Sequence, residues 1–115
     1  MERLRRQQEL HRVLREGERH RAPALVLCAL GRPNGPPRAA VLLAQGFGSS
    51  VARNRARRLA RETARVVLGR IPAPFDLALL VRPQFLDLDF QGRRQLLSDL
   101  LRRAGVIPQK VAQPV

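Results

Sequence analysis

The chain has 115 residues, one cysteine and a formal net charge of +13, with a pI near 12.0. This length predicts a single domain, and no apolar run approaches the ~20 residues that a membrane span requires. The lone Cys28 excludes an internal disulfide, and we interpret it as a buried apolar residue. The charge predicts a polyanionic partner, with nucleic acid favoured over a membrane surface. No apolar segment follows the N-terminal arginines, so we expect a cytoplasmic protein rather than a secreted one.

The first half of the chain is predicted to contain one helix and two strands. Residues 4–16 carry a short apolar helical face and end at Gly17. Residues 24–30 and 38–44 are apolar runs separated by a loop rich in glycine and proline. Because the connection is short, the pair predicts an antiparallel hairpin.

The second half is predicted to contain helix, strand and helix. The helix covers residues 50–68, with Ser49 or Ser50 as its cap and Gly69 as its stop. Residues 76–81 form a nearly all-apolar run, which is typical of a strand covered on both faces. Asp89 caps the last helix, which ends at Gly105, and residues 106–115 are expected to form a disordered tail.

The expected order is therefore helix, strand, strand, helix, strand, helix. A strand, a helix and a following strand can form a βαβ crossover within one sheet. The sequence thus predicts an α+β or α/β sandwich in a single domain covering residues 1–105.

The helix over residues 50–68 is the most informative segment. At roughly 100° per residue, an apolar stripe falls on one face: Ala52, Ala56, Leu59, Ala60, Thr63 and Val67. The opposite face is polar, and Arg55 and Glu62 lie at its border. The residues predicted to contact RNA are Arg53, Asn54, Arg55, Arg57, Arg58, Arg61 and Arg65. Guanidinium forks match phosphate oxygens, so this side predicts a nucleic-acid contact.

Residues suited to catalysis are few, and we expect neither a catalytic residue nor a metal ligand in this protein. His11 and His20 have no nearby nucleophile motif, and we interpret them as surface residues or phosphate contacts. Asp87 and Asp89 have a spacing that fits a turn and a helix cap. Phe47 beside the basic helix has two interpretations, stacking on a base or plugging the core.

Two segments resemble the bacterial ribonuclease P protein subunit family. Residues 48–61 read GSSVARNRARRLAR, which resembles the family pattern Gly-Asn-Ala-Val-x-Arg-Asn-Arg-x-(Lys/Arg)-Arg-x-x-Arg. Residues 9–17 read ELHRVLREG and are similar to the family's first helix and its closing glycine. The resemblance covers residues 4–105.

The resemblance implies a non-catalytic protein subunit of an endoribonuclease holoenzyme that removes 5′ leaders from precursor tRNA. The RNA subunit carries the chemistry with Mg²⁺, and the protein binds no cofactor of its own. The arginine helix contacts the catalytic RNA, and a cleft between the first helix and the sheet holds the precursor-tRNA leader. The protein is expected as a monomer in the ribonucleoprotein, away from membranes, and its βαβ crossover is expected to be left-handed, against the general rule.

The residues that correspond to the leader cleft are Leu10, Leu14, Val26, Cys28 and Phe47. Leu10 and Leu14 stand where the family usually has phenylalanine, and Cys28 aligns with a frequent aromatic position. We therefore expect normal binding of the ribozyme and weak binding of the leader. Two alternatives stay open: a general structural RNA-binding protein of ribosomal type, and an inactive relative with a degraded cleft.

Overall fold

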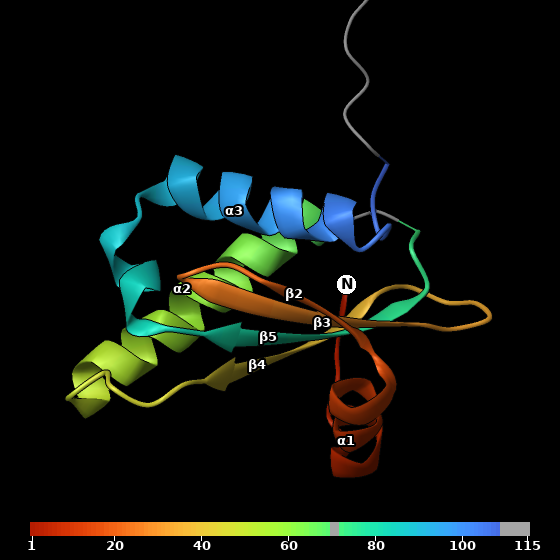
Figure 1. Ribbon diagram of the computed structural model, residues 1–115, viewed down its shortest axis with the longest axis horizontal. Helices are drawn as coiled ribbons and strands as arrows, with labels where there is room; N and C mark the ends of the chain where they lie inside the picture. Colours follow the sequence, from red (N-terminus) through yellow and green to blue (C-terminus); the bar gives the residue numbers. More distant parts are fainter. Residues whose placement is uncertain (70–71, 109–115) are drawn as a thin grey trace, which may run out of the picture.

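A five-stranded mixed sheet forms the middle layer of the computed structural model, which describes residues 1–69 and 72–108 (Figure 1). The strands lie in the order β1-β4-β5-β3-β2. In chain order the elements are β1 (Glu2–Arg3), α1 (Gln7–Glu16), β2 (Glu18–Arg21), β3 (Leu25–Gly31), β4 (Arg38–Leu43), α2 (Ser50–Leu68), β5 (Phe75–Val81), the 3-10 turn η1 (Pro83–Asp87) and α3 (Phe90–Arg103). The expected single-domain α+β sandwich is thus confirmed.

Helices cover both faces of this sheet (Figure 1). Successive strand residues point to opposite faces, and β3 shows the division: Leu25 and Leu27 join the larger core beneath α2 and α3, whereas Cys28 joins a smaller core. That smaller core contains Leu4 and Val13 and lies beneath α1. The fold therefore has two separate surfaces, an α2/α3 face and an α1 face, on which a partner can bind.

The predicted hairpin between residues 24–30 and 38–44 is wrong, because β5 lies between β3 and β4. Ala78 of β5 pairs with Cys28 in an antiparallel ladder and with Ala40 in a parallel ladder. β5 is apolar on both faces, so the central position buries more of it than a sheet edge would. The β4–α2–β5 segment is the expected parallel crossover, and its left-handedness stays a prediction.

Two short strands were missed by the sequence prediction. β1 and β2 occupy the two edges of the sheet, and their residues are all polar. Charged edge strands are common because charge opposes edge-to-edge association, but they lack the apolar alternation that marks a strand in sequence. The first helix also begins at Gln7 rather than residue 4, since Leu4 precedes it and is buried in the core beneath α1.

The start of the predicted tail also needs correction. Val106 is 5% exposed, and its backbone N–H donates to the Leu101 carbonyl at 2.9 Å. Ile107 packs against the same core, so residues 106 and 107 belong to the domain. Pro108 is exposed, and residues 109–115 of the predicted tail lie outside the described residues. Within the described chain, no helix combines the length and apolarity needed to cross a bilayer.

Candidate nucleic-acid interface

The sequence of α2 fixes both its start and its orientation. The Ser49 hydroxyl accepts a hydrogen bond from the Ala52 backbone N–H at 3.1 Å, which satisfies an otherwise unpaired donor. Thr63 donates its hydroxyl to the Leu59 carbonyl at 2.7 Å, so its polar atom is paired although buried. The buried face consists of Ala56, Leu59, Ala60, Thr63, Ala64 and Leu68. The predicted stripe is thus confirmed at its centre, while Ala52 and Val67 are half-buried.

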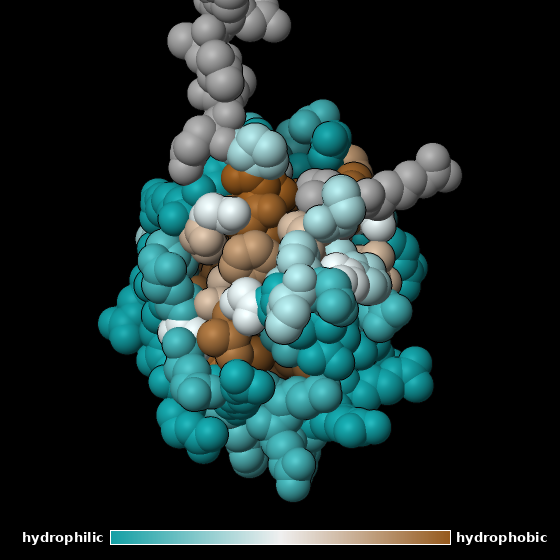
Figure 2. Space-filling model, turned by 90° about the vertical axis from the view of Figure 1, so that its right-hand side faces the viewer, coloured by the Kyte–Doolittle hydropathy of each residue, from teal (hydrophilic) through white to brown (hydrophobic). Residues whose placement is uncertain are grey.

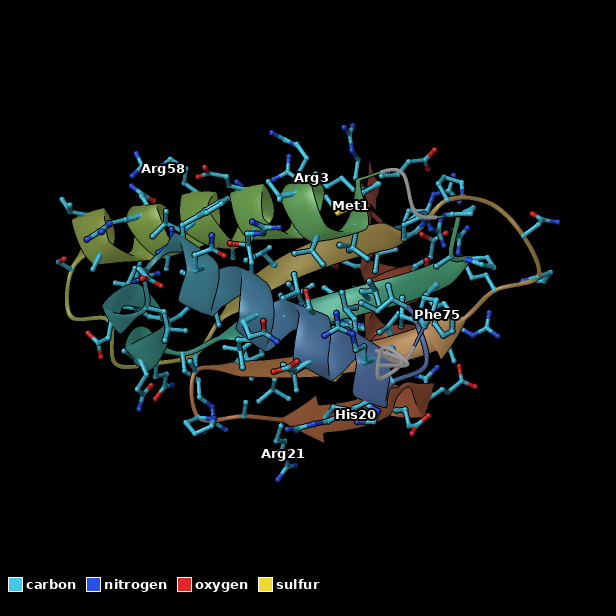
Figure 3. The ribbon with its side chains drawn as sticks, turned by 90° about the horizontal axis from the view of Figure 1, so that it is seen from above. Met1, Arg3, His20, Arg21, Arg58 and Phe75 are labelled. Carbon is cyan, nitrogen blue, oxygen red and sulfur yellow. The ribbon has the colours of Figure 1, made fainter. Side chains whose placement is uncertain are left out.

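The polar side of α2 faces solvent, as predicted. All seven predicted RNA-contact residues are exposed except Arg57, which is half-buried and donates to Asn54 Oδ1 at 3.1 Å. Figure 3 shows Arg58 projecting from α2 away from the sheet. A shallow groove of about 500 Å³ runs along this side and is lined by Asn54, Arg57, Arg58, Arg61, Glu62 and Arg65. The helix therefore presents one continuous basic surface.

The α2 arginines have no ion-pair partner anywhere in the described residues. Some arginines outside α2 do have one: Arg38 pairs with Asp76 at 2.7 Å, and Arg12 pairs with Glu16 at 2.8 Å. Partial desolvation by neighbouring atoms lowers the pKa of Arg61 although the residue is exposed, and the positive charges of Arg3 and Arg57 lower it further. Each guanidinium stays charged near neutral pH, so the α2 side offers uncompensated cations to a polyanion.

A second groove lies on the α1 face of the sheet. Its cavity is about 280 Å³, and its apolar floor includes Leu14, Val26 and Cys28, three residues predicted for the leader cleft. Leu10 does not line the groove but packs against the adjoining small core. The rim is cationic and consists of Arg19, Arg21 and Arg82.

The prediction that placed Phe47 in this cleft is wrong. Phe47 follows β4, where the chain crosses to the α2/α3 face, and it packs against the larger core. It also lines a separate pocket of about 390 Å³ with Arg53 and Arg57. Of its two interpretations, the packing role is confirmed, and its half-exposed ring remains beside the basic helix.

The three rim arginines of the α1-face groove were missed by the sequence analysis. In the β2–β3 ladder, Arg19 lies opposite Cys28 and Arg21 lies opposite Val26. Residues directly opposite in an antiparallel pair share a face, so both arginines border the apolar floor. The two arginines at alternate positions, 19 and 21, are the sequence signal, but they indicate a shared face only once β2 is recognised as a strand. Figure 3 labels Arg21 on this edge strand.

Among the remaining candidates, Asp89 has a structural role. The Asp89 carboxylate accepts from the Gly92 backbone N–H at 2.7 Å and caps α3. His20 lies opposite Leu27, with its Nε2 atom 3.4 Å from Glu18 Oε1. Cys28 is 3% exposed, as expected. Across residues 1–69 and 72–108, no three His, Cys, Asp or Glu side chains gather as a metal site would require.

These features define a class: a small basic α+β protein with an exposed arginine helix and a cation-rimmed apolar groove on the opposite face. Figure 2 shows a further side of the molecule, where mostly hydrophilic residues surround a narrow apolar strip. The family model described as Ribonuclease P matches residues 1–105. The chain belongs to the Ribonuclease P family.

Relatives and solved structures agree with this membership. The chain is 32% identical over 114 residues to the Ribonuclease P protein component of Chloroflexus aurantiacus, covering 98% of this chain and 84% of the relative. It is 37% identical over 106 residues to that of Gluconacetobacter diazotrophicus, covering 90% and 91%. The RNase P protein from Thermotoga maritima superimposes with a TM-score of 0.75 at 28% identity, covering 90% of this chain and 97% of that one. The Staphylococcus aureus RNase P protein, at 19% identity and a TM-score of 0.76 over 92% and 97%, shares the fold.

Proposed function

We propose that this chain is the protein subunit of ribonuclease P, which binds the catalytic RNA through α2 and assists 5′ maturation of precursor tRNA. The observation that carries the proposal is the side of α2 from Arg53 to Arg65, which is exposed and unpaired with carboxylates among the described residues. In a member of this family, such a side has one evident use, namely binding RNA phosphates. Within this proposal the protein acts in the cytoplasm as one copy per ribonucleoprotein.

The chemistry in this proposal belongs to the RNA subunit. Mg²⁺ prefers several oxygen ligands, usually carboxylates and phosphates, whereas the α2 groove holds one carboxylate, Glu62, among arginines. The residues of this surface therefore do not fit a magnesium site. The protein's part is electrostatic, since its cations offset the repulsion between RNA strands that Mg²⁺ otherwise screens.

The test is cleavage of precursor tRNA by the catalytic RNA at low Mg²⁺, with and without the protein. The expected result is that cleavage is restored by the protein and is not restored by Arg53→Ala/Arg57→Ala. Arg15→Ala/Arg103→Ala removes the same charge from exposed positions on α1 and α3 and serves as the control. Binding without stimulation would instead support an inactive relative, and equal binding to unrelated RNA would support a general RNA-binding protein.

We further propose that the α1-face groove holds the precursor-tRNA leader weakly. Stacking on an aromatic side chain contributes ~1–3 kcal/mol per base, and no aromatic residue of the described chain lines this groove. Leu14 and Cys28 provide an apolar floor without a stacking platform, so binding depends on the phosphates that Arg19, Arg21 and Arg82 can reach.

Leader binding is therefore expected to change little when the leader is lengthened. The measurement is precursor affinity of the reconstituted holoenzyme as a function of leader length. Leu14→Phe adds a ring to the groove and should strengthen binding of long leaders by about 1 kcal/mol. Leu14→Met, which conserves volume without adding a ring, is the matched control. A steep dependence on leader length in the unmodified protein would refute weak binding.

A further inference from the structure

The N-terminal arm, residues 1–6 before α1, brings a second set of arginines to α2. β1 pairs with β4 in parallel, with Arg3 beside Ala39, and the Leu4 backbone N–H donates to the Ala39 carbonyl at 2.9 Å. Leu4 turns toward the α1 face and is 5% exposed. Because successive residues alternate between faces, Arg3 and Arg5 fall on the opposite side, beside α2. Figure 3 shows Met1 and Arg3 next to the C-terminal half of this helix.

The arm and the helix enclose a groove that adjoins the α2 groove and shares Arg61 and Arg65 with it. Its cavity is about 280 Å³, and its walls carry Arg3 and Arg5 from the arm and Arg61 and Arg65 from α2. We call it the arm–helix groove. Its floor is formed by the small side chains of Ala39, Val41 and Ala64. No carboxylate of the described chain lines it.

The charges of this groove repel each other. None of its four arginines makes an ion pair with a described residue. The pKa of Arg61 is lowered first by partial desolvation and then by the charges of Arg3 and Arg57, and the second cause is consistent with that repulsion. The N-terminal arm and α2 thus bring four guanidinium groups into one small groove, and no acidic side chain of the described chain lines it. An anion bound in the groove would offset the electrostatic repulsion among these four arginines.

We propose that the arm–helix groove binds a backbone phosphate of the catalytic RNA, so that the RNA-contact surface extends from α2 over the sheet edge onto the N-terminal arm. The inference rests on the proposed function. The occupant is a phosphate rather than a base, because four charged forks and no described aromatic residue line the groove. Such a contact positions the RNA without reading its sequence.

The decisive experiment measures the affinity of the full chain for catalytic RNA at several salt concentrations. Arg3→Ala/Arg5→Ala should weaken binding about tenfold, as expected when one phosphate no longer receives charge-assisted hydrogen bonds. The slope of log affinity against log salt should fall by about 1. Arg3→Lys/Arg5→Lys should restore most of the slope, because the charge is retained. Both positions are exposed, so these variants should fold normally.

The control is Arg15→Ala/Arg103→Ala, which removes two charges elsewhere. If both double variants lose affinity equally, only net charge matters and the arm–helix groove is not a site. An unchanged salt slope in Arg3→Ala/Arg5→Ala also overturns the inference. If the unmodified protein binds catalytic RNA no better than unrelated RNA, the proposed function itself fails, and that result is distinct from the other two.

Discussion

Arg38 on β4 and Arg61 on α2 carry the same side chain in opposite electrostatic surroundings. Arg38 makes a bidentate pair with Asp76, with Nε to Oδ1 and Nη2 to Oδ2 both at 2.7 Å, and an ion pair with Glu9 at 3.1 Å. The hydrogen bonds to Asp76 are the largest of the effects that raise the pKa of Arg38. Arg61 has no such partner among the described residues, and its pKa is lowered by partial desolvation and by the neighbouring Arg3 and Arg57.

The difference separates arginines that hold the fold from arginines available to a partner. Asp76 is 5% exposed and also lies 3.0 Å from Arg32, so one carboxylate pairs with two cations. Glu9 joins α1 to this network through Arg38 and so helps to seat α1 over the sheet. On α2 the acid that lines the exposed groove is Glu62, among four arginines. Removing a charge from the Arg38–Asp76 network should therefore lower the stability of the fold, whereas removing one from α2 should lower the affinity for RNA.

The largest expected effect is on stability. Asp76→Ala removes the carboxylate that Arg32 and Arg38 share, leaving Arg38 only its exposed-side pair with Glu9, and should lower the free energy of unfolding by about 3 kcal/mol. This is the lower end of the range for a broken buried pair, because these arginine side chains keep 20% and 22% exposure to water. Chemical denaturation measures the loss, and Asp76→Asn, which keeps the shape, should lose less. A change below about 0.5 kcal/mol for Asp76→Ala would show that the pair does not hold the fold.

A smaller effect, on binding rather than folding, is expected for α2. Arg53→Ala or Arg57→Ala should weaken affinity for catalytic RNA about tenfold and reduce the salt slope by about 1 for each phosphate that the protein no longer neutralises. Stability should stay within about 0.5 kcal/mol of the unmodified protein, since neither arginine pairs with a described acid. Titrations at several salt concentrations measure affinity and slope, and chemical denaturation measures stability. Unchanged slopes in both variants would place the docking surface elsewhere.

The two regions also differ in how far the sequence predicts them. The basic side of α2 follows from local rules, because helical periodicity and a serine cap lie within residues 49–68. The Arg38–Asp76 pair depends on the parallel β4–β5 register, which aligns residues 38 positions apart. No local pattern contains that register, and the hairpin predicted for β3 and β4 was wrong for the same reason.

The grooves show the same limit. Leu14, Val26 and Cys28 of the α1-face groove came from the family resemblance, and the structure brings them together. Arg19 and Arg21 required recognition of β2, whose four residues carry no apolar signal. The contribution of Arg3 to the arm–helix groove required the two-residue strand β1. Edge strands such as β1 and β2 form because they pair with the sheet, not because their own sequence alternates between apolar and polar residues. A prediction based on periodicity therefore does not locate their side chains.

The smallest expected effect, on stability, tests whether pairing with a carboxylate is enough to make an arginine contribute to the fold. Arg12 and Glu16 pair at 2.8 Å on α1, but their side chains are 67% and 50% exposed. Water and salt screen such a pair, so Glu16→Gln should cost only about 0.3–0.5 kcal/mol and close to nothing in ~1 M salt. A double-mutant cycle with Arg12→Gln isolates the coupling from the effect of an acid at the helix C-terminus. A coupling above about 1 kcal/mol would mean that a carboxylate partner is sufficient to make an arginine structural. The expected small value would mean that burial of the carboxylate, as at Asp76, is also needed.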